Sequence, residues 1–389
     1  MKHFDFDNVP DRRGTDCYKY DEEPGLLPLW VADMDFAIAP CIQEALRKRL
    51  EHPVFGYNII SDQWREAIRR FFQRRYQWEM DTTCLRFVTG VVPALSSSVR
   101  ALSSVGDNVV ICPPVYNIFY NSIRNNGRII KEVPLLLKSG VYELDFEGLE
   151  EAFSHEKTTL CLFCNPGNPS SRIWSKEELS RLAELAKKHN VTILSDEIHG
   201  PITRPGKRYV PFLTVSETAK EVGFAAFSPT KAFNIAGLQT AAIYCENPAL
   251  MKKIERQINT DEVAEPNNFA LVAATSAYDE GEGWLEEMLE YVYSNRDFAT
   301  STLRQALPDI KVIEGDATYL LWVDVSSKVK SSEHFVSYLK KEEKLFLNAG
   351  IAYGQGGEGY VRINLATSRK ILGEALLRFI RGYKNYQGE

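Results

Sequence analysis

The chain has 389 residues, of which 44% are hydrophobic, and 46 Lys and Arg set against 52 Asp and Glu give a formal net charge of −6. This composition excludes a disordered chain, and the mild negative charge argues against a partner that is nucleic acid or an anionic membrane. The chain has no apolar run that could span a bilayer, no apolar core in its first residues (MKHFDFDNVPDRRG), and an odd number of cysteines, seven, so we expect a cytoplasmic protein with reduced thiols.

The first part of the chain, residues 1–40, is rich in Asp, Pro and aromatic residues and predicts an irregular segment. After it, short β-rich runs alternate with amphipathic stretches. The clearest helix begins after Ser175, which has capping-box spacing with Glu178, and ends at Asn190. Four apolar runs predict buried strands at 108–112, 158–163, 191–194 and 222–227.

The C-terminal part has a different order of elements. A long helical stretch around 267–300 precedes a strand at 318–325, a helix, a Gly-rich hairpin and a final helix. Strands separated by helices predict an α/β fold with a mainly parallel sheet. We therefore expect three parts, which are an N-terminal segment packed with the small domain (1–40), a large domain (41–285) and a smaller α+β domain (286–389).

Residues whose side chains could bind a ligand or take part in a reaction follow each of the four predicted strands. Ligands of open α/β sheets bind beyond the carboxyl ends of the strands, so these residues are expected on one rim. They are Tyr116 in PPVYN, Asn168 in NPGNP, Asp196 in SDEIH and Lys231 in SPTK.

Each of these residues also has a purely structural explanation. Asp196 could cap a helix, Lys231 could be a solvated surface residue, and Tyr116 could simply pack. Residues 165–169 could be a turn that is chosen for its backbone geometry. Four such coincidences at consecutive strand ends are much less probable than a binding site.

The motifs along the chain resemble those of pyridoxal-phosphate enzymes of the aspartate-aminotransferase superfamily, fold type I. Within that superfamily the chain is similar to the PatB/MalY-type cystathionine β-lyases. The resemblance covers nearly the whole chain and implies a large domain with a mainly parallel seven-stranded sheet between helices. The motifs are Tyr116, NPGNP (165–169), SDEIH (195–199), SPTKAFNIAGL (228–238), WVADMDF (30–36), FGY (55–57) and GVVPA (90–94).

The resemblance implies pyridoxal 5′-phosphate as the cofactor, and it assigns roles around the cofactor's ring. Lys231 would form the Schiff base, and Asp196 would pair with the pyridine nitrogen. Asn168 would hydrogen-bond the phenolic oxygen, and Tyr116 would stack on the ring. His199 stands where many aminotransferases carry a tyrosine.

A second set of residues is implied for the phosphate and the substrate. The backbone N–H groups of Val91 and Val92, at the start of a helix, suit a phosphate. Arg362 would clamp the substrate carboxylate. The other residues implied here are the hydroxyls of Ser228 and Thr230, Tyr57 from a second subunit, and Asp33 in a segment lining the site.

Two positions depart from the superfamily pattern. Gln239 stands eight residues after Lys231, where many members have a phosphate-binding Arg. Ser171 replaces the final glycine of NPxNPxG. No metal site is expected, because Cys161 and Cys164 form an isolated C-x-x-C in an apolar run.

The resemblance implies a homodimeric C–S β-lyase with a small amino-acid substrate. It would cleave L-cystathionine or another cysteine S-conjugate to a thiol, pyruvate and ammonia. An aminotransferase on the same fold is the nearest alternative, because both reactions begin by removing the Cα proton. A regulatory protein that retains the cofactor and acts through a protein partner is the second alternative.

Overall fold

The computed structural model describes residues 4–388, and its central feature is a seven-stranded sheet. Strand β10 runs antiparallel to both its neighbours, β2 and β9, and the remaining neighbours are parallel. In spatial order the strands are β2 (Leu85–Val88), β10 (Ala241–Tyr244), β9 (Gly223–Phe227), β8 (Thr192–Asp196), β7 (Thr158–Cys164), β3 (Asn108–Ile111) and β4 (Ile129–Glu132).

Helices cover both faces of this sheet, because alternate strand residues point to opposite sides. On β7, Leu160 and Leu162 belong to one apolar cluster, whereas Cys161 and Phe163 belong to another. The first cluster includes residues of α4 (Val91–Leu102), α5 (Ile118–Arg124) and α9 (Pro248–Thr260). The second includes residues of α2 (Pro40–Leu50), α3 (Asp62–Tyr76), α6 (Phe146–Ser154), α7 (Lys176–His189), α8 (Glu217–Val222) and α10 (Ala270–Glu280).

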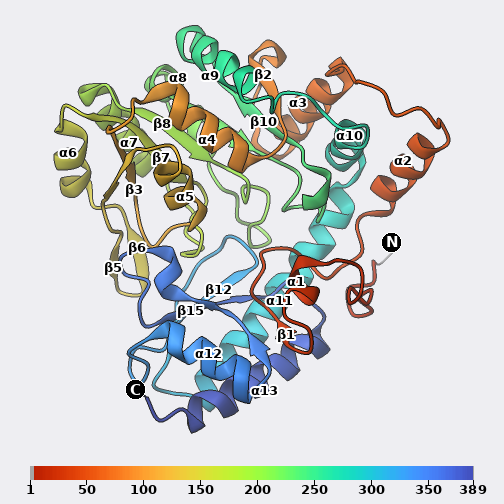
Figure 1. Cartoon of the computed structure of the whole chain (residues 1–389), viewed down its shortest axis with the longest axis vertical. Coiled ribbons are helices and arrows are strands. Elements are labelled where there is room, and N and C mark those ends of the chain that lie inside the picture. The colour runs from red at the N-terminus through yellow and green to blue at the C-terminus, as the bar shows by residue number, and fades with distance from the viewer. Residues whose placement is uncertain (1–3, 389) are drawn as a thin grey trace.

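The C-terminal part forms a four-stranded antiparallel sheet, with β11 (Lys311–Val312), β12 (Leu320–Asp324), β15 (Tyr360–Asn364) and β14 (Asn348–Ala349) in spatial order. Helices α12 (Ser332–Glu342) and α13 (Arg369–Asn385) lie beside it (Figure 1). The N-terminal segment, which contains α1 (Tyr18–Asp21), joins this part because β1 (Leu27–Pro28) pairs in parallel with β13 (Leu345–Phe346).

The helical stretch expected around 267–300 is two helices, α10 and α11 (Glu282–Ala306), which meet at Gly281. A Cβ atom at Gly281 would lie 2.6 Å from the Ala277 carbonyl oxygen and 2.6 Å from the Phe233 ring. Glycine is therefore required at this position, in part by a tertiary contact with the segment that follows Lys231. In Figure 1, α11 runs from the upper part of the molecule into the lower, C-terminal part.

Shorter elements complete the fold. Strands β5 (Leu136–Lys138) and β6 (Val141–Glu143) form a hairpin. Short 3-10 helices occur at Thr82–Cys84, Phe212–Thr214, Ala236–Leu238 and Gly350–Tyr353. Across residues 4–388, no helix combines the length and the apolar character that crossing a membrane would need.

Candidate active site

A cavity of about 300 Å³ opens at the carboxyl ends of the central strands. Asp196 is the last residue of β8, Asn168 lies beyond β7 and Lys231 lies beyond β9, so three neighbouring strands bring them together. The cavity is lined by Ala32, Thr89, Gly90, Val91, Val92, Pro93, Tyr116, Cys164, Asn168, Asp196, Ile198, His199, Lys231 and Gln239.

Lys231 and Asp196 carry the two ionisable groups of opposite sign in this cavity. Burial lowers the pKa of the Lys231 amine to about 8 and raises the pKa of the Asp196 carboxyl to about 7. The Lys231 Nζ atom donates to the carbonyl oxygen of Ala32 at 2.6 Å. One Asp196 oxygen, Oδ1, accepts from the Ile198 N–H at 3.1 Å. Both groups therefore have pKa values within reach of neutral pH.

Tyr116 and His199 add aromatic walls to the cavity. Burial lowers the pKa of His199 to about 3, with the Lys231 and Arg362 cations acting in the same direction, so its imidazole is neutral. Its Nδ1 atom is buried and has no hydrogen-bond partner, and its ring contacts the edge of Tyr319. Burial raises the pKa of Tyr116 to about 12, which keeps the phenol protonated.

Arg362 lies just behind Asn168. Its Nη2 atom donates to the Trp30 carbonyl at 2.7 Å, and its Nη1 atom lies 3.4 Å from the Asn168 Oδ1 atom. The side chain is 4% exposed, and its Nε atom has no partner. A buried guanidinium with an unused donor is suited to a carboxylate ligand.

The N-terminus of α4 forms another wall of the cavity. No side chain caps this helix, so the first-turn N–H groups of Val91 and Val92 lack a side-chain acceptor. Ser228 and Thr230 do not belong to the cavity lining, and their hydroxyls lie 2.7 Å from each other. The Ser228 hydroxyl also donates to the Thr240 carbonyl at 2.6 Å.

Two predicted substrate-binding residues do not belong to the cavity lining in the single chain. Tyr57 is fully exposed. The Asp33 carboxylate lies 2.6 Å from the Arg12 guanidinium and 3.6 Å from the Lys19 amine. The roles of both residues remain predictions.

The two positions that depart from the superfamily pattern share a backbone feature. Gln239 lines the cavity at φ 52°, and Ser171 adopts φ 55°, in the region that glycine favours. The Ser171 hydroxyl donates to the Leu320 carbonyl at 3.0 Å and lies 3.1 Å from the Thr318 hydroxyl. These contacts hold the left-handed geometry at Ser171 without a glycine.

Comparison with known proteins gives a consistent family. The family model described as "Aminotransferase class I and II" matches residues 25–379. Cystathionine β-lyase PatB of Bacillus subtilis (strain 168) is 39% identical over 379 residues, which cover 96% of this chain and 98% of the relative. The chain belongs to the aminotransferase class I and II family.

Two solved structures also resemble this family member. A pyridoxal-phosphate-bound putative aminotransferase from Clostridium difficile 630 superposes with a TM-score of 0.95 at 37% identity and covers 98% of this chain and 100% of its own. The pyridoxal-phosphate-bound C–S lyase from Staphylococcus hominis superposes with a TM-score of 0.92 at 30% identity, over 98% and 99% of the two chains. The predicted fold class and the predicted PatB/MalY-type family are confirmed.

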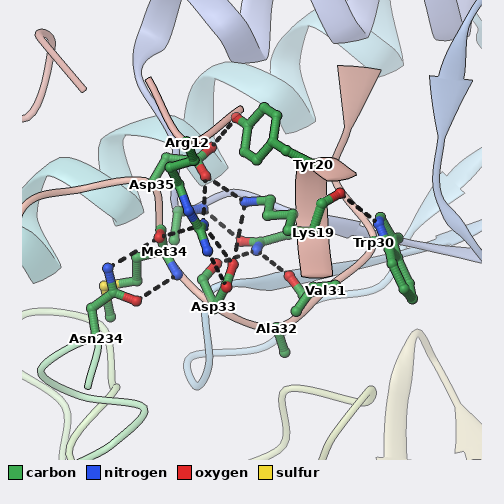
Figure 2. Close-up of polar contacts among 12 residues, drawn as sticks. Arg12, Lys19, Tyr20, Trp30, Val31, Ala32, Asp33, Met34, Asp35 and Asn234 are labelled. Atoms are coloured by element: carbon green, nitrogen blue, oxygen red, sulfur yellow. Dashed lines mark hydrogen bonds and ion pairs between the residues drawn. The ribbon is translucent and has the colours of Figure 1, made fainter. Parts of the chain in front are cut away.

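The sequence did not predict which residues bind the segment 30–36, called here the 30–36 loop. Figure 2 shows part of this arrangement. The loop presents its carbonyl oxygens to side chains from distant segments. The Asn364 amide donates to the carbonyls of Val31 and Asp33, at 2.6 Å each. The Asn234 amide donates to the carbonyls of Met34 and Phe36, at 3.0 and 2.8 Å.

Proximity in sequence was the only available signal for these two amides. Asn234 follows Lys231 by three residues, and Asn364 follows Arg362 by two. Nothing in the sequence distinguishes them from asparagines that cap a helix or stabilise a turn. Ala32, Thr89, Cys164 and Ile198 of the cavity lining were also missed, because nothing in the sequence distinguishes them from residues that only pack.

Proposed function

We propose that the chain is a pyridoxal-phosphate-dependent C–S β-lyase that cleaves L-cystathionine or a related cysteine S-conjugate to a thiol, pyruvate and ammonia. The observation that carries the proposal is the placement of Lys231 and Asp196 in one cavity with Asn168, Tyr116 and His199. The relatives named above include a cystathionine β-lyase and a C–S lyase.

The residues present fit the cofactor. The cavity places an amine, a carboxylate, an amide and the uncapped start of α4 around a volume of about 300 Å³. The buried His199 Nδ1 atom also lacks a partner inside the chain, which suits a site completed by a ligand. Lys231 would hold the cofactor covalently, Asp196 and Asn168 would bind its ring edge, and Tyr116 would stack on it.

The phosphate would lie at the start of α4. The N–H groups of Val91 and Val92 and the helix dipole supply donors and positive potential there. The Thr230 hydroxyl is the next candidate donor, because the single hydrogen of the Ser228 hydroxyl is donated to the Thr240 carbonyl.

When bound, pyridoxal 5′-phosphate supplies a conjugated ring that accepts negative charge from the substrate Cα atom. Lys231, once the substrate amine has taken its place on the cofactor, would accept the Cα proton on its freed Nζ atom, because its lowered pKa of about 8 leaves part of the amine neutral near pH 7. The Cβ–S bond breaks, the sulfur leaves with the bonding electrons as a thiolate, and water converts the three-carbon remainder to pyruvate and ammonia. Asp196, as a carboxylate, would pair with the cationic ring nitrogen and keep it protonated.

Arg362 would bind the substrate carboxylate. Its guanidinium is already fixed by the Trp30 carbonyl and by Asn168, so little side-chain freedom is lost when a carboxylate binds. Binding in this way would orient the Cα–H bond toward Lys231, which is the geometric requirement for proton removal.

The test is to mix the purified protein with L-cystathionine, without any added 2-oxo acid, and to measure pyruvate and free thiol. We expect both products in equal amounts. Lys231→Ala should lose the visible absorbance of the bound cofactor together with turnover, whereas Lys176→Ala, which changes an exposed lysine, should keep both. Amino transfer to an added 2-oxo acid with no thiol released would identify an aminotransferase instead.

We infer a homodimer for the same site. Residues 54–59 include four side chains with large exposed apolar surfaces, which are Val54, Phe55, Tyr57 and Ile59. An exposed apolar stretch of this kind is typical of a protein interface. In the dimer, Tyr57 would reach the phosphate in the site of the second copy.

We also propose a cytoplasmic location. All seven cysteines are free thiols in the structure. Unpaired thiols are typical of compartments in which glutathione and thioredoxin keep cysteine reduced.

A further inference from the structure

An ionic cluster, buried at Lys19 and Asp35 and partly exposed at Arg12 and Asp33, lies beside the 30–36 loop (Figure 2). It consists of two cations, Arg12 and Lys19, and two carboxylates, Asp33 and Asp35. The side chains of Lys19 and Asp35 are 0% and 1% exposed. The Tyr20 hydroxyl also donates to Asp35, at 3.1 Å.

Arg12 is the member that joins the cluster to the loop backbone. Its two terminal nitrogens donate hydrogen bonds to the two oxygens of the Asp33 carboxylate, at 3.0 and 2.6 Å. The Nη1 atom also donates to Asp35 and to the Met34 carbonyl, at 3.0 Å each. One guanidinium therefore fixes three consecutive residues of the loop.

The same loop carries the acceptor for the Lys231 amine. The Ala32 carbonyl lies one residue before Asp33 and accepts from Lys231 Nζ at 2.6 Å and from the Tyr319 hydroxyl at 3.0 Å. An error in the position of Asp33 would move this carbonyl with it, because the two residues share a peptide bond.

We propose that Arg12 and Asp33 are positioning residues for Lys231, which hold the Ala32 carbonyl against the lysine amine and balance the charge beside it. The proposal rests on the proposed function, since it assigns Lys231 as the amine that binds the cofactor and takes the proton. Neither Arg12 nor Asp33 belongs to the cavity lining, so they act through the loop.

The charged groups around Lys231 determine in which direction each substitution should shift the pKa of its amine. Asp33 from the N-terminal segment and Asp196 from β8 raise the pKa of the amine, whereas burial and Arg362 from β15 lower it. His199, buried beside the amine, is neutral, and Tyr319, with a pKa raised by burial, stays protonated. Arg12 neutralises Asp33, so its loss should strengthen the effect of Asp33 on Lys231.

The experiment measures the pH dependence of cofactor uptake. Cofactor-free full-length chain is mixed with pyridoxal 5′-phosphate over a pH series, and the rise in visible absorbance gives a rate and its pH midpoint. We expect Arg12→Met to shift the midpoint upward and Asp33→Asn to shift it downward, each by about one pH unit. The double variant Arg12→Met/Asp33→Asn should return close to the wild-type midpoint, because its charges are again balanced.

Steady-state kinetics supply a second readout. Loss of the Arg12 contacts should lower kcat by on the order of tenfold to 10²-fold and change KM much less. The reason is that the Lys231 amine, which would then be misplaced, acts in proton transfer. Arg13→Met is the matched control, since Arg13 is the next residue, its side chain is 74% exposed and its ion-pair partner within residues 4–388 is the exposed Asp11.

Opposite shifts in the two single variants separate positioning from general damage to the fold. Shifts in the same direction, or none relative to Arg13→Met, would overturn the proposal. If Arg12→Met does not fold, Asp33→Asn alone carries the test through its downward shift. Covalent cofactor uptake that persists in Lys231→Ala would instead overturn the proposed function.

Discussion

Asp196 is the residue whose chemistry is easiest to isolate. It ends β8 at the cavity, and its Oδ1 atom already accepts from the Ile198 N–H. A carboxylate that faces a cationic ring nitrogen forms a charge-assisted hydrogen bond worth about 1.5–3 kcal/mol. We therefore expect Asp196→Asn to lower kcat by about tenfold to 10²-fold while Lys231 still takes up the cofactor. Pyruvate release measures kcat, and a variant with full activity would contradict the assigned role.

The neighbouring Glu197 is a buried carboxyl group with a structural role. It accepts hydrogen bonds from the Phe212 N–H at 2.8 Å, the Ser195 hydroxyl at 2.9 Å and the Tyr209 hydroxyl at 3.1 Å. Burial raises its pKa from 4.5 to about 7, even though these donors act in the opposite direction. Between these two values the folded chain keeps a proton that the unfolded chain releases.

This proton gives a pH prediction for stability. Because the folded state binds more protons, the contribution of Glu197 to the free energy of unfolding falls as the pH rises from 4.5 to about 7. In urea unfolding of the cofactor-free protein across this window, the free energy of unfolding should therefore fall less, or rise more, with pH in Glu197→Gln than in the wild type. Asp196 titrates in both proteins and cancels in the comparison. Equal pH dependence in the two proteins would refute the raised pKa.

At the scale of one element, α7 shows what local sequence can predict. The Ser175 hydroxyl accepts from the Glu178 N–H, the Glu178 carboxylate accepts from the Ser175 N–H, and Asn190 ends the helix at φ 56°. Both ends were predicted, because capping depends on residues a few positions apart. The break between α10 and α11 was not predicted, because Gly281 is required by the ring of Phe233, far away in the chain.

The capping box also gives an element-scale prediction. Ser175→Ala removes the acceptor for the Glu178 N–H and should lower the free energy of unfolding by about 1 kcal/mol. Ser180→Ala is the matched control in the middle of the same helix, and alanine there should be neutral or slightly stabilising. Chemical denaturation measures both changes. Equal effects of the two substitutions would show that the cap contributes nothing.

Some residues of the candidate site could likewise be placed from the sequence, and others could not. Residues that follow strands, such as Asp196 and Lys231, could be placed on one rim because the order of parallel strands fixes where their ends lie. Asn234 and Asn364 could not be placed, since their amide N–H groups donate to backbone carbonyls. A carbonyl is present at every residue, so no pattern of side chains marks the ones that are used.

At the scale of the whole molecule, we propose the division into a segment 1–40, a large domain 41–285 and a small domain 286–389. The seven-stranded sheet lies within residues 85–244 and the four-stranded sheet within 311–364, which supports this division. The pairing of β1 with β13 supports the assignment of the N-terminal segment to the small domain. The continuous helix α11 crosses the proposed boundary at 285.

The proposed dimer is also tested at this scale. Ile59 is 84% exposed, and placing a charge there should weaken self-association by about tenfold or more if residues 54–59 lie in the interface. Val105→Glu is the matched control, because Val105 is 78% exposed in another part of the chain. Light scattering over a dilution series should show Ile59→Glu dissociating first. A wild-type protein that is a single chain at every concentration would end the dimer proposal.

The 30–36 loop has a consequence for which sequence changes it can tolerate. Besides the carboxylates of Asp33 and Asp35, side chains bind the carbonyl oxygens of the loop, which are the same at every residue type. Replacements at Val31 or Met34 therefore leave the recognised atoms in place. Inserting or deleting one residue would move every carbonyl past its donor at once. Natural variation at Val31 and Met34 should accordingly be freer than at Asp33 and Asp35, whose carboxylates bind Arg12 and Lys19, while the number of residues in the loop is conserved.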